Sequence, residues 1–422
     1  MGPSSKGVSL LSIASSSAPR SAYLHIPFCR RRCYYCDFPV AVVGDKPPLA
    51  AASVERINGS NSGTIAHYVE VLCREIRSTH SLGASLETIF FGGGTPSLLS
   101  VAQLNQILAA LDRQFGIATA EISMEVDPGT FDRAQIQGYR DAGVNRVSLG
   151  VQSFQPELLT ACGRSHTVAE VYAAVEQIRQ VGFENFSLDL ISGLPHQTLQ
   201  EWQDSLEKAI ALSPTHLSCY DLTIEPMTAF GRQLKPGLSP LPSDETTAQM
   251  YCTAQQILTG AGYSHYEISN YAKPGFQCRH NRVYWENQPF YGFGMGATSC
   301  VGGDRFSRPR KTQEYYEWVE TGQVRELQAV QALADVLLET LMLGLRLAEG
   351  ISVGQLTQQF GTEMVGRVKR CLVPYVQKGW VEVTETAASL SIAESTERIR
   401  LSDPEGFLFS NVVLADLFEE FD

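Results

Sequence analysis

The chain has 422 residues, of which 44% are hydrophobic and 18% charged, a balance typical of globular domains that excludes a wholly disordered protein. Its formal net charge of -12 argues against a dedicated nucleic-acid binder, because such proteins are usually basic. Ten cysteines in so long a chain are not the pattern of a small disulfide-stabilised domain. No apolar run reaches the roughly 18 residues of a membrane-spanning helix. We therefore expect a cytoplasmic protein whose thiols are reduced.

The first 20 residues are rich in serine and lack acidic side chains. They hold no apolar core long enough for a secretory signal, so we predict a disordered tail over residues 1–20, with a short transit peptide as the less favoured alternative. The apolar run "AYLHI", residues 22–26, predicts a strand that leads directly into "HIPFCRRRCYYCDF", His25–Phe38. Residues 41–64, rich in Gly, Ser, Pro and Ala, then indicate a loop or insertion.

A regular alternation of strands and helices follows. Further short apolar runs, each ending at a turn, predict strands over residues 88–91, 122–126, 146–151, 186–191 and 216–224, and amphipathic patterns predict helices that include residues 65–78, 104–115, 169–180 and 201–212. Strands that alternate with helices in this way favour right-handed βαβ units and a parallel sheet. Together with the first strand, the five strands listed above make six strand–helix units. We therefore predict an α/β fold, a partial (β/α)6 TIM-like barrel over residues 21–235. An open doubly wound sheet is the alternative.

The alternation of predicted strands and helices ends after residue 235. A Pro-rich stretch, a helix from about residue 243 to 260 and a segment rich in Gly and aromatic residues lead us to expect a linker region over residues 236–310. Residues 311–422 are mainly helical in pattern, with "VEVTE" (381–385) and "RIRLSD" (398–403) able to pair as a small β wing. We predict a separate C-terminal domain there.

Three cysteines, Cys29, Cys33 and Cys36, have the spacing C-x3-C-x2-C. A structural zinc site needs four ligands, which His25 or Asp37 could complete. A [4Fe-4S] cluster also normally takes four thiolates, so three would leave one iron with an open coordination site for a substrate. Unrelated reduced thiols are the third interpretation, and the spacing favours the cluster over both alternatives.

The segment "YLHIPFCRRRCYYCDF" resembles the motif of the radical S-adenosylmethionine (SAM) superfamily, in the branch of oxygen-independent coproporphyrinogen III dehydrogenase and its relatives. The resemblance extends from about residue 20 to the end, which includes a C-terminal domain of the HemN type. It implies a radical-SAM barrel whose three thiolates hold a [4Fe-4S] cluster, with SAM chelating the fourth iron through its amino and carboxylate groups.

The resemblance also implies a set of SAM contacts. "FFGGGTPS" is similar to the family's GGGTP loop, and polar residues at the ends of the following strands match its SAM contacts in order and spacing. Taken singly, these residues could equally be a turn, a helix cap or a surface charge. The predicted SAM residues are Tyr23, Gly93, Gly94, Thr95, Glu125, Gln152, Arg164 and Asp189.

Two functions share this scaffold in the family. The dehydrogenase motif carries a further cysteine two positions after the third, where this chain has Phe38. The haem-chaperone branch lacks that cysteine and has an HNxxYW motif, which "HNRVYW" resembles. A neutral imidazole is a good axial ligand to haem iron, and flat aromatic rings suit a macrocycle. We therefore predict His280, Asn281, Tyr284 and Trp285 as haem contacts, with a structural turn beside core aromatics as the alternative.

Thr298, in "YGFGMGATS", stands where a histidine is usual in the chaperone branch, which argues against a haem role for that position. The prediction is a haem chaperone that holds a [4Fe-4S] cluster, SAM and haem and transfers haem to client haem proteins; coproporphyrinogen III dehydrogenase is the alternative. Phe38 argues against that oxidase activity, we assign no catalytic residue, and whether the chain is an enzyme stays open. A homodimer and peripheral membrane contact through clients stay open as well, and no nucleic-acid partner is expected.

Overall fold

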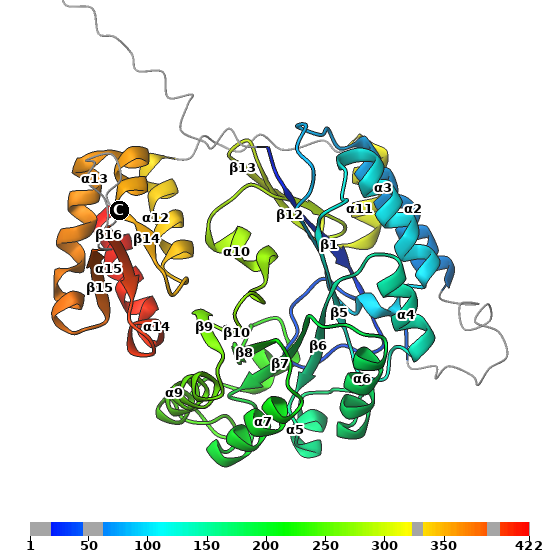
Figure 1. Cartoon of the computed structure of the whole chain (residues 1–422), viewed down its shortest axis with the longest axis horizontal. Coiled ribbons are helices and arrows are strands. Elements are labelled where there is room, and N and C mark those ends of the chain that lie inside the picture. Colours follow the sequence, from blue (N-terminus) through cyan, green and yellow to red (C-terminus); the bar gives the residue numbers. More distant parts are fainter. Residues whose placement is uncertain (1–17, 45–61, 323–331, 386–396, 422) are drawn as a thin grey trace, which may run out of the picture.

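A computed structural model describes residues 18–44, 62–322, 332–385 and 397–421 (Figure 1). Most of the predicted N-terminal tail and of the predicted loop at residues 41–64 lies outside these residues. The six predicted strands all form and lie parallel to one another in one sheet: β1 (Ser21–Ile26), β4 (Thr88–Gly93), β5 (Glu121–Val126), β6 (Arg146–Gln152), β7 (Phe186–Ser192) and β8 (His216–Asp221).

The helices that follow these strands begin at well-defined caps. Ser100, Thr167 and Thr198 each accept a hydrogen bond from the third residue of their helix, whose Gln or Glu side chain reaches back to the cap. Such capping boxes satisfy backbone donors that the helix leaves free. The helices here are α2 (Ser62–Ser78), α3 (Val101–Phe115), α4 (Arg133–Asp141), α5 (Pro156–Ala161), α6 (Val168–Gln180), α7 (Leu199–Ala211) and α8 (Ala229–Gln233), with a 3-10 turn at Pro96–Leu98.

The strand order identifies the architecture. Within the described residues the sheet has nine strands in the order β11-β1-β4-β5-β6-β7-β8-β10-β9, so the six predicted strands are neighbours in chain order. A doubly wound sheet would reverse its order at a switch point, and this sheet does not. Figure 1 shows the sheet curved, with α2, α3, α4, α6 and α7 on its outer side. The partial TIM-like barrel is therefore confirmed and the doubly wound alternative is wrong.

The segment expected to be a linker contributes to the same sheet. β11 (Tyr291–Phe293) pairs in parallel with β1, and β10 (Asn270–Ala272) and β9 (Ser264–Glu267) extend the opposite edge as antiparallel strands. The sheet thus continues well past residue 235. The other elements of this segment are α9 (Asp244–Gly260), α10 (Arg279–Trp285), β12 (Thr298–Val301) and β13 (Asp304–Ser307).

The C-terminal residues form a second core. It is built from α12 (Leu333–Gly344), α13 (Val353–Gln377), α14 (Glu405–Leu408) and α15 (Ser410–Phe421), with a three-stranded sheet of β14 (Ile351–Ser352), β15 (Val381–Glu385) and β16 (Glu397–Leu401). β15 and β16 pair as the predicted wing. α11 (Thr312–Glu320) does not belong here, because its buried Tyr315 and Val319 pack in the barrel core.

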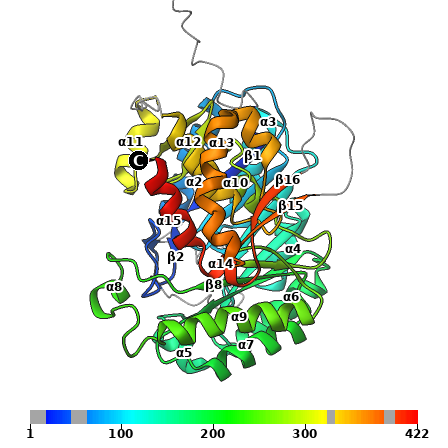
Figure 2. The ribbon, with the colours of Figure 1, turned by 90° about the vertical axis from the view of Figure 1, so that its left-hand side faces the viewer.

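The second core lies beside the barrel, where Figure 2 shows α13 and α15 in front of it. Backbone hydrogen bonds join the two: Ile268 N–H donates to Arg346 O at 3.0 Å, and Ala348 N–H donates to Tyr266 O at 3.0 Å. The described part of the chain contains no helix with the length and apolar character needed to cross a membrane.

Candidate metal and cofactor site

The three cysteines lie on a loop that is fastened at its base. β2 (Phe28–Cys29) follows β1 and pairs in parallel with β3 (Ala41–Val42), so the chain leaves and returns at the same place. His25 connects β1 to the end of this loop, since its Nε2 lies 2.9 Å from Pro39 O and its Nδ1 lies 3.1 Å from the Tyr23 hydroxyl. Burial lowers the pKa of His25 to about 4, so the ring is neutral and serves as a hydrogen-bonding bridge.

The glycine loop after β4 packs directly against this cysteine loop. Gly94 N–H donates to Ile26 O at 2.9 Å, and a Cβ at Gly94 would lie 2.7 Å from Phe28 O. Gly93 has a φ of +111°, and a Cβ there would lie 2.4 Å from the His25 ring. Only glycine fits these close approaches, so the sequence "GGG" holds the two loops together.

All three cysteines are free thiols that are neither fully buried nor fully exposed. Burial raises the pKa of Cys29 to about 12 and also raises that of Cys36, so these thiols must lose protons when they bind a metal. The zinc alternative needs four ligands on one ion. Among the described residues, no group of three or more His, Cys, Asp or Glu side chains is arranged to hold a single metal ion.

A pocket of about 510 Å³ opens beside the cysteine loop. The structure brings the three cysteines into its wall together with all but one of the predicted SAM residues, at the carboxyl ends of the strands where ligand sites form in such barrels. These wall residues are Cys29, Cys33, Cys36, Gly93, Gly94, Thr95, Glu125, Gln152, Arg164 and Asp189. The prediction from strand ends therefore identified side chains that meet in one place.

Two half-buried carboxyl groups, Glu125 and Asp189, lie on the floor of this pocket, which we call the mouth pocket. Glu125 accepts a hydrogen bond from Gly93 N–H at 3.1 Å, and burial together with Asp189 raises its pKa to about 8. Asp189 accepts hydrogen bonds from Ser148 at 3.0 Å, and burial raises its pKa too. A buried carboxyl of raised pKa is stabilised in its ionised form by a nearby cation. This floor is suited to a positively charged ligand.

Arg164 adds a positive charge to the wall of the mouth pocket. It pairs through Nη2 with Asp127, and its Nη1 lies 3.5 Å from Cys33 Sγ. Asp127 was missed from the sequence although it directly follows the end of β5, the same signal that identified Glu125. Gln152 reaches the pocket from a bulge in β6 and has a φ of +65°, which is uncommon for a residue other than glycine.

A second, inner cavity of about 160 Å³ adjoins the mouth pocket, because both are lined by Glu125, Ser148, Asp189 and Tyr220. Tyr23, the remaining predicted SAM residue, lines this inner cavity. Arg146 and three of the predicted haem residues, His280, Asn281 and Tyr284, line it as well.

The HNRVYW segment forms α10, which lies at the opposite end of the strands from the cysteines. Glu121, at the start of β5, accepts a hydrogen bond from Arg279 N–H at 3.1 Å, and His280 Nδ1 lies 2.8 Å from the hydroxyl of Thr88 at the start of β4. His280 Nε2 lies 2.8 Å from the Tyr284 hydroxyl. The His280 side chain is 1% exposed and burial lowers its pKa to about 3.

This arrangement argues against the predicted haem contact at His280, because both ring nitrogens already have hydrogen-bond partners. Trp285 does not join the group at the cavity: its ring lies under the guanidinium of Arg346 at 5.3 Å. The alternative interpretation, a structural role for this motif, describes the observed contacts better. The Thr298 hydroxyl lies 2.7 Å from Ser307, within the β12–β13 hairpin.

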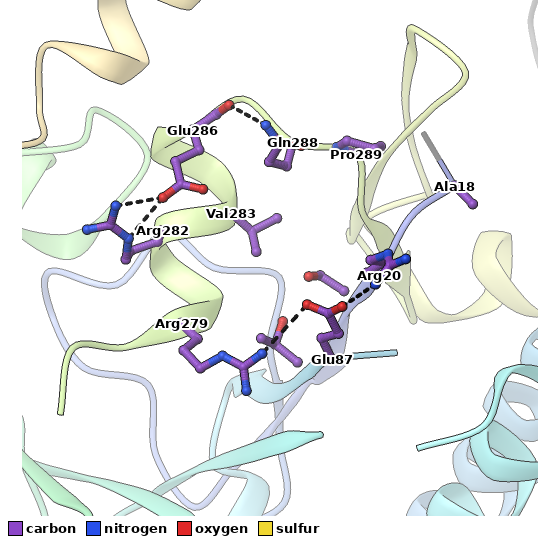
Figure 3. A pocket seen from close by; sticks show the side chains of 11 residues that line it. Ala18, Arg20, Glu87, Arg279, Arg282, Val283, Glu286, Gln288 and Pro289 are labelled. Atoms are coloured by element: carbon purple, nitrogen blue, oxygen red, sulfur yellow. Dashed lines mark hydrogen bonds and ion pairs between the residues drawn. The ribbon is translucent and has the colours of Figure 1, made fainter. Parts of the chain in front are cut away.

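The outer face of α10 borders a third pocket, of about 410 Å³ (Figure 3). Figure 3 shows Arg279 and Arg20 reaching the same carboxylate, Glu87, and Arg282 beside Glu286. Arg20 and Arg279 therefore share one carboxylate and Arg282 has a separate partner, and α10 separates this outer pocket from the inner cavity.

We expect His280→Ala to lower the free energy of unfolding by about 1–3 kcal/mol, because it leaves the Thr88 and Tyr284 hydroxyls without their buried partner. A urea titration measures this loss. Haemin binding, followed by the Soret band, should persist in the variant. The exposed His67 provides the control, since His67→Ala should change neither property. Loss of the Soret shift in a stable His280→Ala protein would restore the haem-ligand interpretation.

Comparison with protein families matches residues 23–209 to the Radical SAM superfamily and residues 332–394 to the HemN C-terminal domain. The chain is similar to the heme chaperone HemW of Synechocystis sp., with 46% identity over 410 residues that cover 95% of this chain and 96% of that protein. It is also similar to heme chaperone HemW of Lactococcus lactis, with 34% identity covering 96% of this chain and 97% of that protein.

Among solved structures, coproporphyrinogen III oxidase HemN from Escherichia coli, described as a radical SAM enzyme, resembles this chain with a TM-score of 0.75. The match covers 98% of this chain and 92% of that chain at 24% sequence identity. At this identity the likeness concerns the fold, and it includes both the barrel and the C-terminal domain.

Proposed function

Because this chain belongs to the HemW family of haem chaperones, within the radical SAM superfamily, we propose that it binds haem and transfers it to client haem proteins. The observation that carries the proposal is the 46% identity to a heme chaperone over nearly the whole length of both proteins. Phe38 supports it, since it occupies the position of the dehydrogenase's additional cysteine and is 53% exposed on the cysteine loop.

We propose further that Cys29, Cys33 and Cys36 hold a [4Fe-4S] cluster and that the mouth pocket holds SAM. The cluster would supply an electron and an iron with an open coordination site. The residues that line the mouth pocket fit SAM chemically. Gly93 and Gly94 line the mouth pocket with backbone that carries no side chain, and the carboxyls of Glu125 and Asp189 offset positive charge.

We expect Asp189→Ala to raise the dissociation constant for SAM about tenfold, which corresponds to about 1.4 kcal/mol, while the cluster content stays unchanged. The reason is that Asp189 lines the mouth pocket from strand β7, whereas the three cysteines lie on the loop that follows β1. Isothermal titration with SAM under anaerobic conditions measures the affinity, and iron analysis measures the cluster. A variant with unaltered SAM affinity would remove Asp189 from the proposed site.

SAM affinity is also expected to increase with pH. Below its pKa of about 8 the Glu125 carboxyl is mostly neutral and balances no positive charge. Raising the pH from about 7 to about 9 ionises it, so the dissociation constant should fall, by at most about tenfold per pH unit below the pKa. Titrations across this range in the native protein and in Glu125→Gln provide the test. An equally steep dependence in Glu125→Gln would show that another group is responsible.

The alternative function, coproporphyrinogen III dehydrogenase, is separated from the proposal by a turnover assay. Anaerobic protein with its cluster assembled is supplied with coproporphyrinogen III, SAM and a reductant. We expect no protoporphyrinogen to accumulate, since the chain lacks the additional cysteine of the dehydrogenase motif at Phe38. Steady product formation would replace the chaperone proposal by the enzymatic one.

A further inference from the structure

One acidic side chain connects two of the proposed SAM contacts to the cysteines. Asp127 pairs through Oδ1 with Arg164 and accepts a hydrogen bond through Oδ2 from the Thr95 hydroxyl at 3.2 Å. Each of these two donors also reaches a cysteine. Arg164 Nη1 lies 3.5 Å from Cys33 Sγ, and Thr95 Oγ1 lies 3.7 Å from Cys29 Sγ.

The local backbone holds Asp127 rigidly. Its N–H donates to Ser97 Oγ at 3.2 Å, and its carbonyl oxygen accepts a hydrogen bond from the Thr130 hydroxyl at 2.6 Å. Gly150 leaves room for the side chain, because a Cβ there would lie 2.7 Å from Asp127 Oδ1. Contacts with the 3-10 turn, with its own loop and with strand β6 therefore fix the position of Asp127.

The partners of Asp127 are constrained by it in turn. The Arg164 side chain is 9% exposed, and a buried guanidinium needs a charge partner to remain in place. The Thr95 hydroxyl has one proton, and Asp127 Oδ2 is closer to it than Cys29 Sγ is. When that proton points to Asp127, the lone pairs of Thr95 are left to accept from a ligand ammonium.

We propose that Asp127 is a positioning residue of this site: it fixes Arg164 and Thr95 in the orientations that receive the amino-acid end of SAM beside the cluster thiolates. This inference rests on the proposed SAM and cluster assignment and deepens it. Asp127 also places a negative charge near Cys29, with the Thr95 hydroxyl between them, which disfavours adding an electron to a cluster held there.

Two substitutions separate charge from position. Asp127→Asn keeps the size of the side chain but removes its charge, so we expect the SAM dissociation constant to rise about tenfold and the midpoint potential of the SAM-free cluster to shift upward. Asp127→Glu restores the charge one methylene farther out. It should return the potential toward that of the native protein and leave SAM binding weak, because Arg164 and Thr95 are no longer held in place.

The experiment measures SAM affinity by anaerobic titration calorimetry and the potential by a redox titration followed by electron paramagnetic resonance, at equal iron content. Asp132→Asn is the matched control, since Asp132 caps α4 in the same loop and asparagine caps a helix equally well. It should change neither quantity. Native affinity and potential in Asp127→Asn, or native affinity in Asp127→Glu, would overturn the positioning role alone. A native protein with no cluster or no SAM binding would overturn the cofactor assignment and this inference with it.

Discussion

Cys33→Ala is expected to abolish the brown absorbance of the anaerobically assembled protein and its bound iron and sulfide. The substitution leaves two thiolates, Cys29 and Cys36, on a loop that has no fourth cysteine in its motif. An iron–sulfur cluster normally takes four thiolates, and the proposed site already has only three. Absorption spectra with iron and sulfide analysis after reconstitution measure the loss.

Cys371→Ala is the matched control, because Cys371 is a partly buried free thiol in α13, far along the chain from the cysteine loop. It should assemble the cluster as the native protein does. If Cys33→Ala kept its iron and its colour, the ligands would lie elsewhere and the assignment of the cysteine loop would be wrong.

Glu75→Gln should lower the free energy of unfolding by about 3–5 kcal/mol. Glu75 is fully buried in α2 and pairs with the Arg308 guanidinium at 2.8 Å. It also accepts hydrogen bonds from the Tyr315 hydroxyl at 2.7 Å and from Gly294 N–H at 2.9 Å. The neutral amide leaves a buried arginine without its counter-charge, in a network that joins α2, α11 and the loop after β11.

Urea unfolding of the two proteins, followed by circular dichroism, measures this difference. Glu420→Gln is a suitable control, because Glu420 pairs with Arg367 at the surface, where side chains are 40% and 37% exposed. It should cost about 0–1 kcal/mol. Equal effects of the two substitutions would mean that the buried network contributes no more than a surface ion pair.

The parallel strands were predictable because their signal is local. Each is a short apolar run followed by a turn, and each pairs with the next strand along the chain. β11 was not predictable in this way. It has three residues, lies in a Gly-rich segment and pairs Tyr291 with Ala22, almost at the other end of the barrel sequence. No periodic pattern marks so short a strand, and its pairing is decided by tertiary contacts.

The candidate site shows the same division between local and distant information. Glu125 and Asp189 were predicted because they match the SAM contacts of the resembled family in order and spacing and because ligand sites form at one mouth of a parallel barrel. His280 was named for its chemistry, and a histidine beside aromatic residues suits both haem binding and a buried hydrogen-bond network. Its contacts with Tyr284 and with Thr88, 192 residues earlier in the chain, favour the network.

The role of a haem chaperone is tested most directly by following haem onto this protein and off it again. Anaerobic protein with its cluster assembled is titrated with haemin, freed of excess, and mixed with apomyoglobin while the Soret band is recorded. We predict a saturable Soret shift on loading and then the spectrum of myoglobin, with this chain recovered free of haem and its cluster intact. A Soret band that never departs from that of free haemin, or haem that stays with this chain in the presence of the acceptor, would contradict the proposed delivery of haem.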